Sequence, residues 1–232
     1  MNQNIIAFLF AFLFVTQTHA QKYLLSKDPA MDTTIQKWGA NRAHYVGAQL
    51  ALGFVADQGV AGAKTDFWRS SHFQFGFRYK RKLSNVFSIG TDLSWKIFTV
   101  GLKQEQGKKL PDTLLHRRQN VATNNFSLGG FLRINFDPKR GNKLGTFLDL
   151  GASADWSFFY SEFTKDKLSD GSFVDVSRYR TNTNEPISYY FNARLGKGKF
   201  ALYALYRLSN WYKSSANFPE PARLFTGIQF GF

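Results

Sequence analysis

Residues 72–80 read HFQFGFRYK, and the strict alternation within this stretch decides the fold. Successive side chains of a β-strand point to opposite faces, so a period of two marks an extended strand. One face of the stretch is aromatic and consists of Phe73, Phe75, Phe77 and Tyr79. The other face is polar and consists of His72, Gln74, Gly76, Arg78 and Lys80. The stretch therefore predicts a β-strand with one apolar face and one polar face.

The same alternation recurs along most of the chain. Seven further segments show it: residues 46–54, 87–97, 126–136, 148–158, 187–195, 202–208 and 224–232. Short turn-forming sequences join three pairs of neighbours: LSNV at 83–86, DPKRGNK at 137–143 and GKGK at 196–199. Longer connections join the other pairs: residues 57–66, 102–120, 160–185 and 210–222. Short turns at one rim and long loops at the other are typical of outer-membrane proteins. The pattern predicts an all-β fold, an eight-stranded antiparallel transmembrane β-barrel built as an up-and-down meander.

Alternation alone does not say which face points inward, because a soluble lipocalin-like barrel would bury the apolar face. Three features favour the inverted arrangement. Six glycines make room on the polar face: Gly47, Gly53, Gly76, Gly90, Gly129 and Gly151. Four of the five tryptophans lie toward the long-loop ends, as in an interfacial aromatic girdle: Trp68, Trp95, Trp156 and Trp211. The last predicted strand closes on the aromatic-rich IQFGF.

The N-terminal residues indicate export. Residues 1–20 contain an apolar run from Ile5 to Val15 that is too short to span a bilayer, and they predict a secretory signal peptide cleaved near Ala20. Residues 21–41 are polar without a clear period and are expected to form a periplasmic lead-in to the barrel at 42–232. A mean hydropathy of −0.30, with no other long apolar run, argues against a bundle of membrane helices.

The chain is strongly basic, with 30 Lys and Arg against 16 Asp and Glu and a net charge of +14. Because export removes the chain from the cytosol, we expect outer-membrane lipids and lipopolysaccharide as its neighbours, and no nucleic acid. The chain has no cysteine, so it can form no disulfide or thiolate metal site. We expect no cofactor.

The polar face carries charges that are expected to meet inside the barrel. An eight-stranded barrel has an interior just wide enough for side chains. Counting across the predicted hairpins places Arg78 opposite Asp92 and Arg133 opposite Asp149. Four more residues can extend this lumen charge network: Lys96, Asp155, Arg194 and Arg207. Buried charges must be paired to be tolerated, so a plug of ion pairs is favoured over a conducting path or a proton relay.

The predicted short turns carry a cluster of basic residues, here called the basic rim. It consists of Lys80, Arg81, Lys82, Lys139, Arg140, Lys143, Lys197 and Lys199. These side chains can hold phospholipid head groups, or they can bind a periplasmic protein or cell-wall polymer. A second basic group in the predicted outer loops can meet lipopolysaccharide phosphates: Lys103, Lys108, Lys109, Arg117 and Arg118.

Three stretches of the chain resemble a known family. They are NNFSLGGFLRINFDPKRGNKLGTFLDLGASADWSFF at 124–159, ALYALYRLSNWY at 201–212 and FTGIQFGF at 225–232. Together they resemble the PorT-like small outer-membrane barrels common in Bacteroidota. The resemblance covers most of the mature chain and implies an eight-stranded barrel in the outer membrane, with one branch of the family associated with protein secretion. It carries over no catalytic residue.

One stretch invites an enzymatic interpretation. RLSNW at 207–211, with Glu220 eleven residues after Ser209, is faintly similar to the His-x-Ser-Asn and later Glu of outer-membrane lipid A deacylases. Arg207 stands at the histidine position, and an arginine cannot act as the general base that activates a serine. We therefore expect a non-enzymatic accessory in envelope assembly or protein secretion, with outer-membrane or periplasmic protein partners. A lipid A-modifying enzyme and a narrow channel remain the alternatives.

Overall fold

The computed structural model describes residues 36–139, 141–179 and 183–231. The expected signal peptide at 1–20, residues 21–35 of the expected lead-in, Arg140 and Phe232 lie outside the described residues. The described residues form nine strands and one short 3-10 helix, η3. The strands are β1 (His44–Val55), β2 (Thr65–Lys82), β3 (Phe87–Leu102), β4 (Arg118–Asn135), β5 (Thr146–Lys167), β6 (Phe173–Tyr179), β7 (Ile187–Lys197), β8 (Phe200–Arg207) and β9 (Leu224–Gly231). The η3 turn covers Ser214–Ala216. No helix in this part of the chain is long and apolar enough to cross a membrane.

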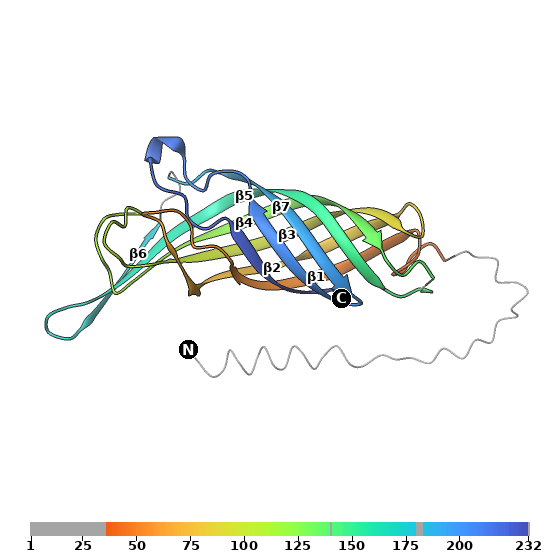
Figure 1. Cartoon of the computed structure of the whole chain (residues 1–232), viewed down its shortest axis with the longest axis horizontal. Helices are drawn as coiled ribbons and strands as arrows, with labels where there is room; N and C mark the ends of the chain where they lie inside the picture. Colours follow the sequence, from red (N-terminus) through yellow and green to blue (C-terminus); the bar gives the residue numbers. More distant parts are fainter. Residues whose placement is uncertain (1–35, 140, 180–182, 232) are drawn as a thin grey trace, which may run out of the picture. The chain divides into compact units, whose positions relative to one another are not determined.

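Eight of the strands close into a ring, shown in Figure 1. All neighbouring strands are antiparallel, in the order β4-β3-β2-β1-β9-β8-β7-β5, and the pairing of β4 with β5 closes the ring. Each strand of the ring therefore pairs with the strands before and after it along the chain, apart from the closure of β9 on β1 and the omission of β6. The expected all-β antiparallel architecture with eight strands in the ring is confirmed.

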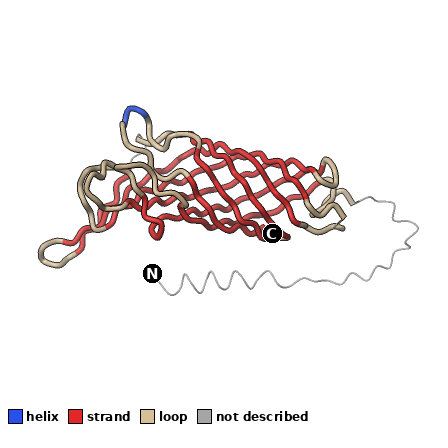
Figure 2. The backbone as a smooth tube through the Cα atoms, in the orientation of Figure 1, coloured by secondary structure: helices blue, strands red, loops and turns tan. Residues whose placement is uncertain are grey.

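A ninth strand was not expected. The connection predicted at 160–185 instead continues β5 as far as Lys167 and returns as β6, which pairs only with Ser161–Lys167 of β5. The resulting hairpin projects beyond the ring in Figures 1 and 2. A bulge explains why the alternation did not reveal it. Asn124 and Asn125 pair with Phe159 and Ser157, so Phe158 is an extra residue that reverses the inward and outward positions of the rest of β5.

The two ends of the ring differ, as Figure 2 shows. Short turns join β2 to β3, β4 to β5 and β7 to β8 at one end, here called the short-turn end. The long connections lie at the other. β1 starts and β9 finishes at the short-turn end, since His44 pairs with Arg81 and Phe230 pairs with Phe200. The described part of the lead-in lies at this end too, where Asn41 hydrogen-bonds Gly141 and Asn142 of the β4–β5 turn.

Burial alternates along the ring strands with the apolar side chains outside. Phe77, Leu128 and Leu202 are 56%, 64% and 64% exposed, whereas the polar positions between such residues are buried. Asp149 and Asp155, for example, are fully buried. The ring is therefore apolar on its outer face and polar over much of its interior.

Side chains fill the interior in two zones. Toward the long-connection end the filling is an apolar cluster that includes Val55, Phe98, Leu102, Trp211 and Phe225. The Phe98 ring packs on those of Tyr190, Phe225, Trp211 and His72. Toward the short-turn end the filling consists of ion pairs, described next.

Candidate functional site

Three arginines and two aspartates form one network inside the ring near the short-turn end. Arg78 donates from Nε to Asp92 Oδ1 at 2.8 Å and from Nη1 to Asp149 Oδ2 at 2.9 Å. Arg133 donates from Nε and Nη2 to the two oxygens of Asp149 at 2.6 and 2.9 Å. Arg194 donates from Nη1 to Asp92 Oδ2 at 2.7 Å. All five side chains are buried.

The strand register places these groups. Arg78 lies opposite Asp92 across β2 and β3, and Arg133 lies opposite Asp149 across β4 and β5. The bonds from Arg194 on β7 to Asp92 on β3, and from Arg78 on β2 to Asp149 on β5, cross the interior. The network therefore ties five of the eight ring strands together.

Two phenylalanines hold the guanidinium groups in place. The Arg133 guanidinium lies 3.6 Å from the centroid of the Phe147 ring, and the Arg78 guanidinium lies 4.4 Å from that of Phe131. Such stacking favours a desolvated guanidinium and restricts its orientation. Both phenylalanines occupy polar-face positions of their strands, and that parity could have identified them as interior residues from the sequence.

A second ion pair lies deeper in the ring. Lys96 Nζ donates to both oxygens of Asp155 at 3.0 Å, and to the Ser153 hydroxyl at 3.1 Å. This pair is separate from the arginine network in hydrogen bonding. Deeper still, the buried His72 Nδ1 meets the Tyr203 hydroxyl at 2.6 Å.

Arg207 does not join the network. Its Nη2 donates to Glu220 Oε2 at 3.0 Å and to the Pro221 carbonyl at 3.1 Å, near the long-connection end. Glu220 also accepts the Trp211 backbone N–H. The Ser209 hydroxyl accepts the Tyr189 backbone N–H at 3.1 Å. Arg207 and Glu220 thus form a structural ion pair that fastens the last long connection.

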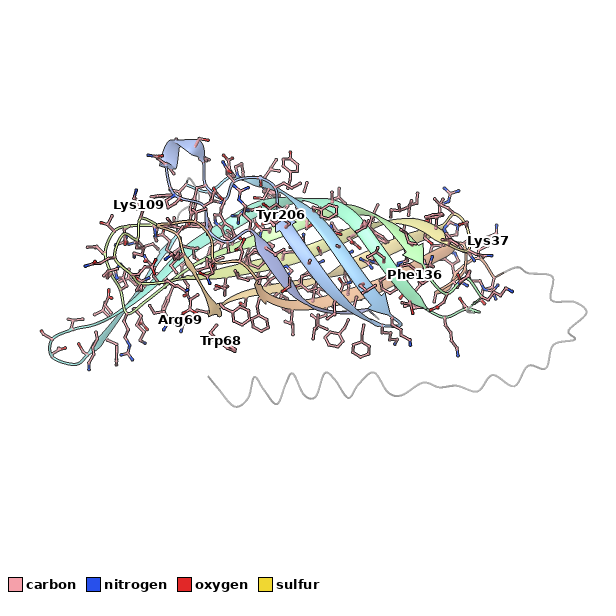
Figure 3. All side chains as sticks on the ribbon, in the orientation of Figure 1. Lys37, Trp68, Arg69, Lys109, Phe136 and Tyr206 are labelled. Carbon is pink, nitrogen blue, oxygen red and sulfur yellow. The ribbon has the colours of Figure 1, made fainter. Side chains whose placement is uncertain are left out.

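The aromatic girdle predicted from the sequence is wrong at one position. Trp68, Trp95 and Trp156 are 86%, 39% and 56% exposed on the outer face, but Trp211 is only 4% exposed. Trp211 lies in the interior against Phe98, and the Arg207 guanidinium lies 4.6 Å from its ring centroid. Trp68 projects outward beside Arg69 (Figure 3), where β2 bulges between Asp66 and Ser71.

The basic rim also needs correction. Lys80 points into the ring, where it is 1% exposed and its Nζ donates to the Ala40 carbonyl at 2.5 Å. Lys82 is half-buried and reaches the Asn41 carbonyl. The residues of the rim that stay exposed at the short turns are Arg81, Lys139, Lys143, Lys197 and Lys199. The exposed Lys37 and Arg42 enlarge the rim. Sequence reasoning missed them because Lys37 lies in the lead-in, which shows no period, and Arg42 precedes the first alternating segment; Figure 3 labels Lys37 there.

The long-connection end carries a polar cluster in place of a wholly free basic surface. Lys108 is buried, binds the Gln119 side chain and pairs with Asp112 at 3.2 Å. It is therefore not available to meet lipopolysaccharide. Burial alone would raise the pKa of Asp112, but the hydrogen bond and charge of Lys108 outweigh it and hold that pKa below its ordinary value. The Nδ1 atom of His116 lies 2.7 Å from Oδ2 of Asp166, and this hydrogen bond lowers the pKa of Asp166.

Comparison of the chain with protein-family models, with curated proteins and with solved structures finds no match. Among residues 36–139, 141–179 and 183–231, no group of three or more His, Cys, Asp or Glu side chains is arranged to hold a metal ion.

Proposed function

We propose that the chain is an exported outer-membrane β-barrel of the PorT-like kind. Its ring would span the membrane, and it would act without catalysis as an accessory in envelope assembly or protein secretion. One observation carries the proposal: apolar side chains cover the outer face of the ring while charged and amide side chains fill much of its interior.

The physical argument concerns the solvent that such a surface requires. In water, an apolar belt that runs around a whole ring would promote association, because soluble proteins rarely expose apolar patches beyond a few hundred Å². In a bilayer the same belt is stabilised. A closed ring also satisfies the backbone hydrogen bonds of every strand, which the hydrocarbon core demands. Exposed Trp68, Trp95 and Trp156 are suited to the lipid interface.

The orientation follows from the general pattern of such barrels. Short turns lie on the periplasmic side and long connections lie outside. A signal peptide at residues 1–20 would bring the chain across the inner membrane. The basic rim would then face the periplasm, where it can bind head groups or a periplasmic partner, and the β5–β6 hairpin would project outward.

The architecture is tested by fractionation and by gel mobility. We expect the full chain in the outer-membrane fraction, and we expect an unboiled sample to migrate differently from a boiled one because a closed ring resists detergent. A chain found only in the soluble fraction, with no mobility shift, would rule out the membrane proposal.

The accessory role is tested by crosslinking in native outer membranes. The full chain should be recovered with envelope proteins after mild detergent extraction. An R81Q/K139Q variant should lose the partners that bind the basic rim. A matched K103Q/K109Q variant, changed at the opposite end, should retain them. A chain that stays monomeric under every gentle condition would contradict the role.

A further inference from the structure

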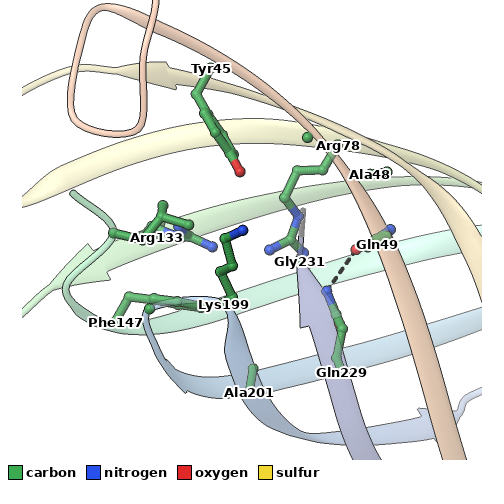
Figure 4. Close-up of a pocket in the computed structure, with 13 residues that line it drawn as sticks. Tyr45, Ala48, Gln49, Arg78, Arg133, Phe147, Lys199, Ala201, Gln229 and Gly231 are labelled. Atoms are coloured by element: carbon green, nitrogen blue, oxygen red, sulfur yellow. Dashed lines mark hydrogen bonds between the residues drawn. The ribbon is translucent and has the colours of Figure 1, made fainter. Parts of the chain in front are cut away.

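A small cavity opens at the short-turn end of the ring, shown in Figure 4. Its enclosed volume is only about 30 Å³, and it opens to solvent at its mouth. Arg78 on β2 and Arg133 on β4 point into this space, Lys199 reaches it from the β7–β8 turn, and Tyr45 approaches from β1. The glycines and alanines of the lining, such as Gly47 and Ala201, leave the space between them open. The cavity is therefore lined in part by positively charged side chains.

The charge balance around the cavity is positive. Three guanidinium groups of the network face only two carboxylates, which leaves one positive charge, and Lys199 adds a second. None of the thirteen described residues that line the cavity carries a carboxylate. Arg133 is buried and Lys199 is exposed at the mouth, so an anion between them would reduce the repulsion of the two positive charges.

The Arg133 guanidinium offers a specific contact. Its Nε and Nη2 are taken by Asp149, whereas its Nη1 has no acceptor among the described residues. Phe147 stacks on the guanidinium and keeps it in one orientation, so little side-chain entropy is lost when a ligand binds. Planar, weakly hydrated guanidinium groups suit phosphate oxygens, and a lysine ammonium adds a movable point charge.

We propose that the open mouth of this cavity binds a phosphate group through Arg133 and Lys199. A phosphate monoester carries about −1.5 to −2 charges at pH 7, which suits a site with an excess of positive charge. The group can be free phosphate or the terminal phosphate of a lipid headgroup that reaches the mouth of the ring. The site goes beyond the proposed membrane role, because it needs only the folded chain.

The experiment is a calorimetric titration of the detergent-solubilised full chain with inorganic phosphate. A titration with chloride at matched ionic strength is the reference. We expect saturable binding of phosphate that chloride does not reproduce. K199Q should weaken it about tenfold, the usual effect of losing one charge-assisted hydrogen bond. The matched control K197Q changes an exposed lysine of the same turn that lies on the outward parity of β7, and should bind as the wild type does.

A second variant tests the cavity independently of charge. A201L places a larger side chain in the lining and should abolish binding; K199Q still tests the site if A201L fails to fold.

Competition between a phospholipid and inorganic phosphate identifies the source of the phosphate. A headgroup site should bind lysophosphatidic acid in mixed micelles more tightly than inorganic phosphate, and a site for free phosphate should show the reverse. The proposal is overturned if phosphate binds no better than chloride, or if K199Q and K197Q bind equally. These outcomes do not depend on whether the ring spans a membrane.

Discussion

Replacing Asp149 by asparagine should destabilise the ring by about 3 to 5 kcal/mol, the usual cost of removing one partner from a buried ion pair. The carboxylate is fully buried and accepts three hydrogen bonds, one from Arg78 and two from Arg133. Without its charge, three arginines share the single carboxylate of Asp92. The amide of asparagine keeps the volume, so the effect is electrostatic and leaves no cavity.

The measurement is the free energy of unfolding from urea titrations of the refolded chain in detergent micelles. D175N is the matched control, because Asp175 pairs with Lys165 at 3.3 Å on the exposed hairpin outside the ring, and such pairs contribute about 0 to 1 kcal/mol. An R133M/D149L double variant should lose less stability than D149N, since it removes both members of a pair together. A D149N chain within about 1 kcal/mol of the wild type would refute the view that this network holds the ring together.

Three further outcomes are expected. L128R should cost about 2 to 4 kcal/mol in phospholipid vesicles, because an arginine on a lipid face is poorly solvated, whereas a water-facing site would change by less than about 0.5 kcal/mol in the same urea titration. W211A should cost about 3 to 5 kcal/mol by creating an interior cavity, and W68A on the exposed bulge should cost far less, as thermal unfolding would reveal. The pKa of Asp112 is lowered in the fold, so the stability it adds is complete above its unfolded pKa of about 3.8 and is lost as pH falls below that value. Hydrogen exchange of residues 103–117, corrected for intrinsic rates, should therefore be unchanged from pH 7 to 5 and faster at pH 3, and D112N should be faster at every pH.

Much of the ring could be predicted because its signal is local. A period of two assigns every side chain to a face, and counting from a short turn fixes the register. That count placed Arg78 opposite Asp92, where they lie in the structure. The same parity predicts Lys80 as an interior residue. Its nearness to a turn favours the rim instead, but the burial of Lys80 follows the alternation.

The failures share a physical cause, since each depends on contacts that periodicity does not encode. The extra residue Phe158 reverses the alternation of β5, so that Glu162 and Thr164 beyond it are buried. Without knowledge of the bulge, the sequence of this last part of β5 has the pattern of a loop. Trp211 lies in a connection without a period, and long-range contacts such as the pair of Arg207 with Glu220 and the hydrogen bond of Tyr160 with Tyr212 hold that connection against the ring.

The two zones of the interior constrain what the ring can do. An ion that enters at the short-turn end meets arginines that are already paired with Asp92 and Asp149. Beyond them lies the apolar cluster centred on Phe98, whose ring is 5.3 Å from that of Tyr190 and nearly parallel to it. A hydrated ion gains nothing from that apolar zone, whereas an anion at the mouth balances the charge excess of the arginine network. The interior is therefore better suited to holding an anion at one end than to conducting it through, and single-channel recordings from reconstituted bilayers should show no conductance even when phosphate is present.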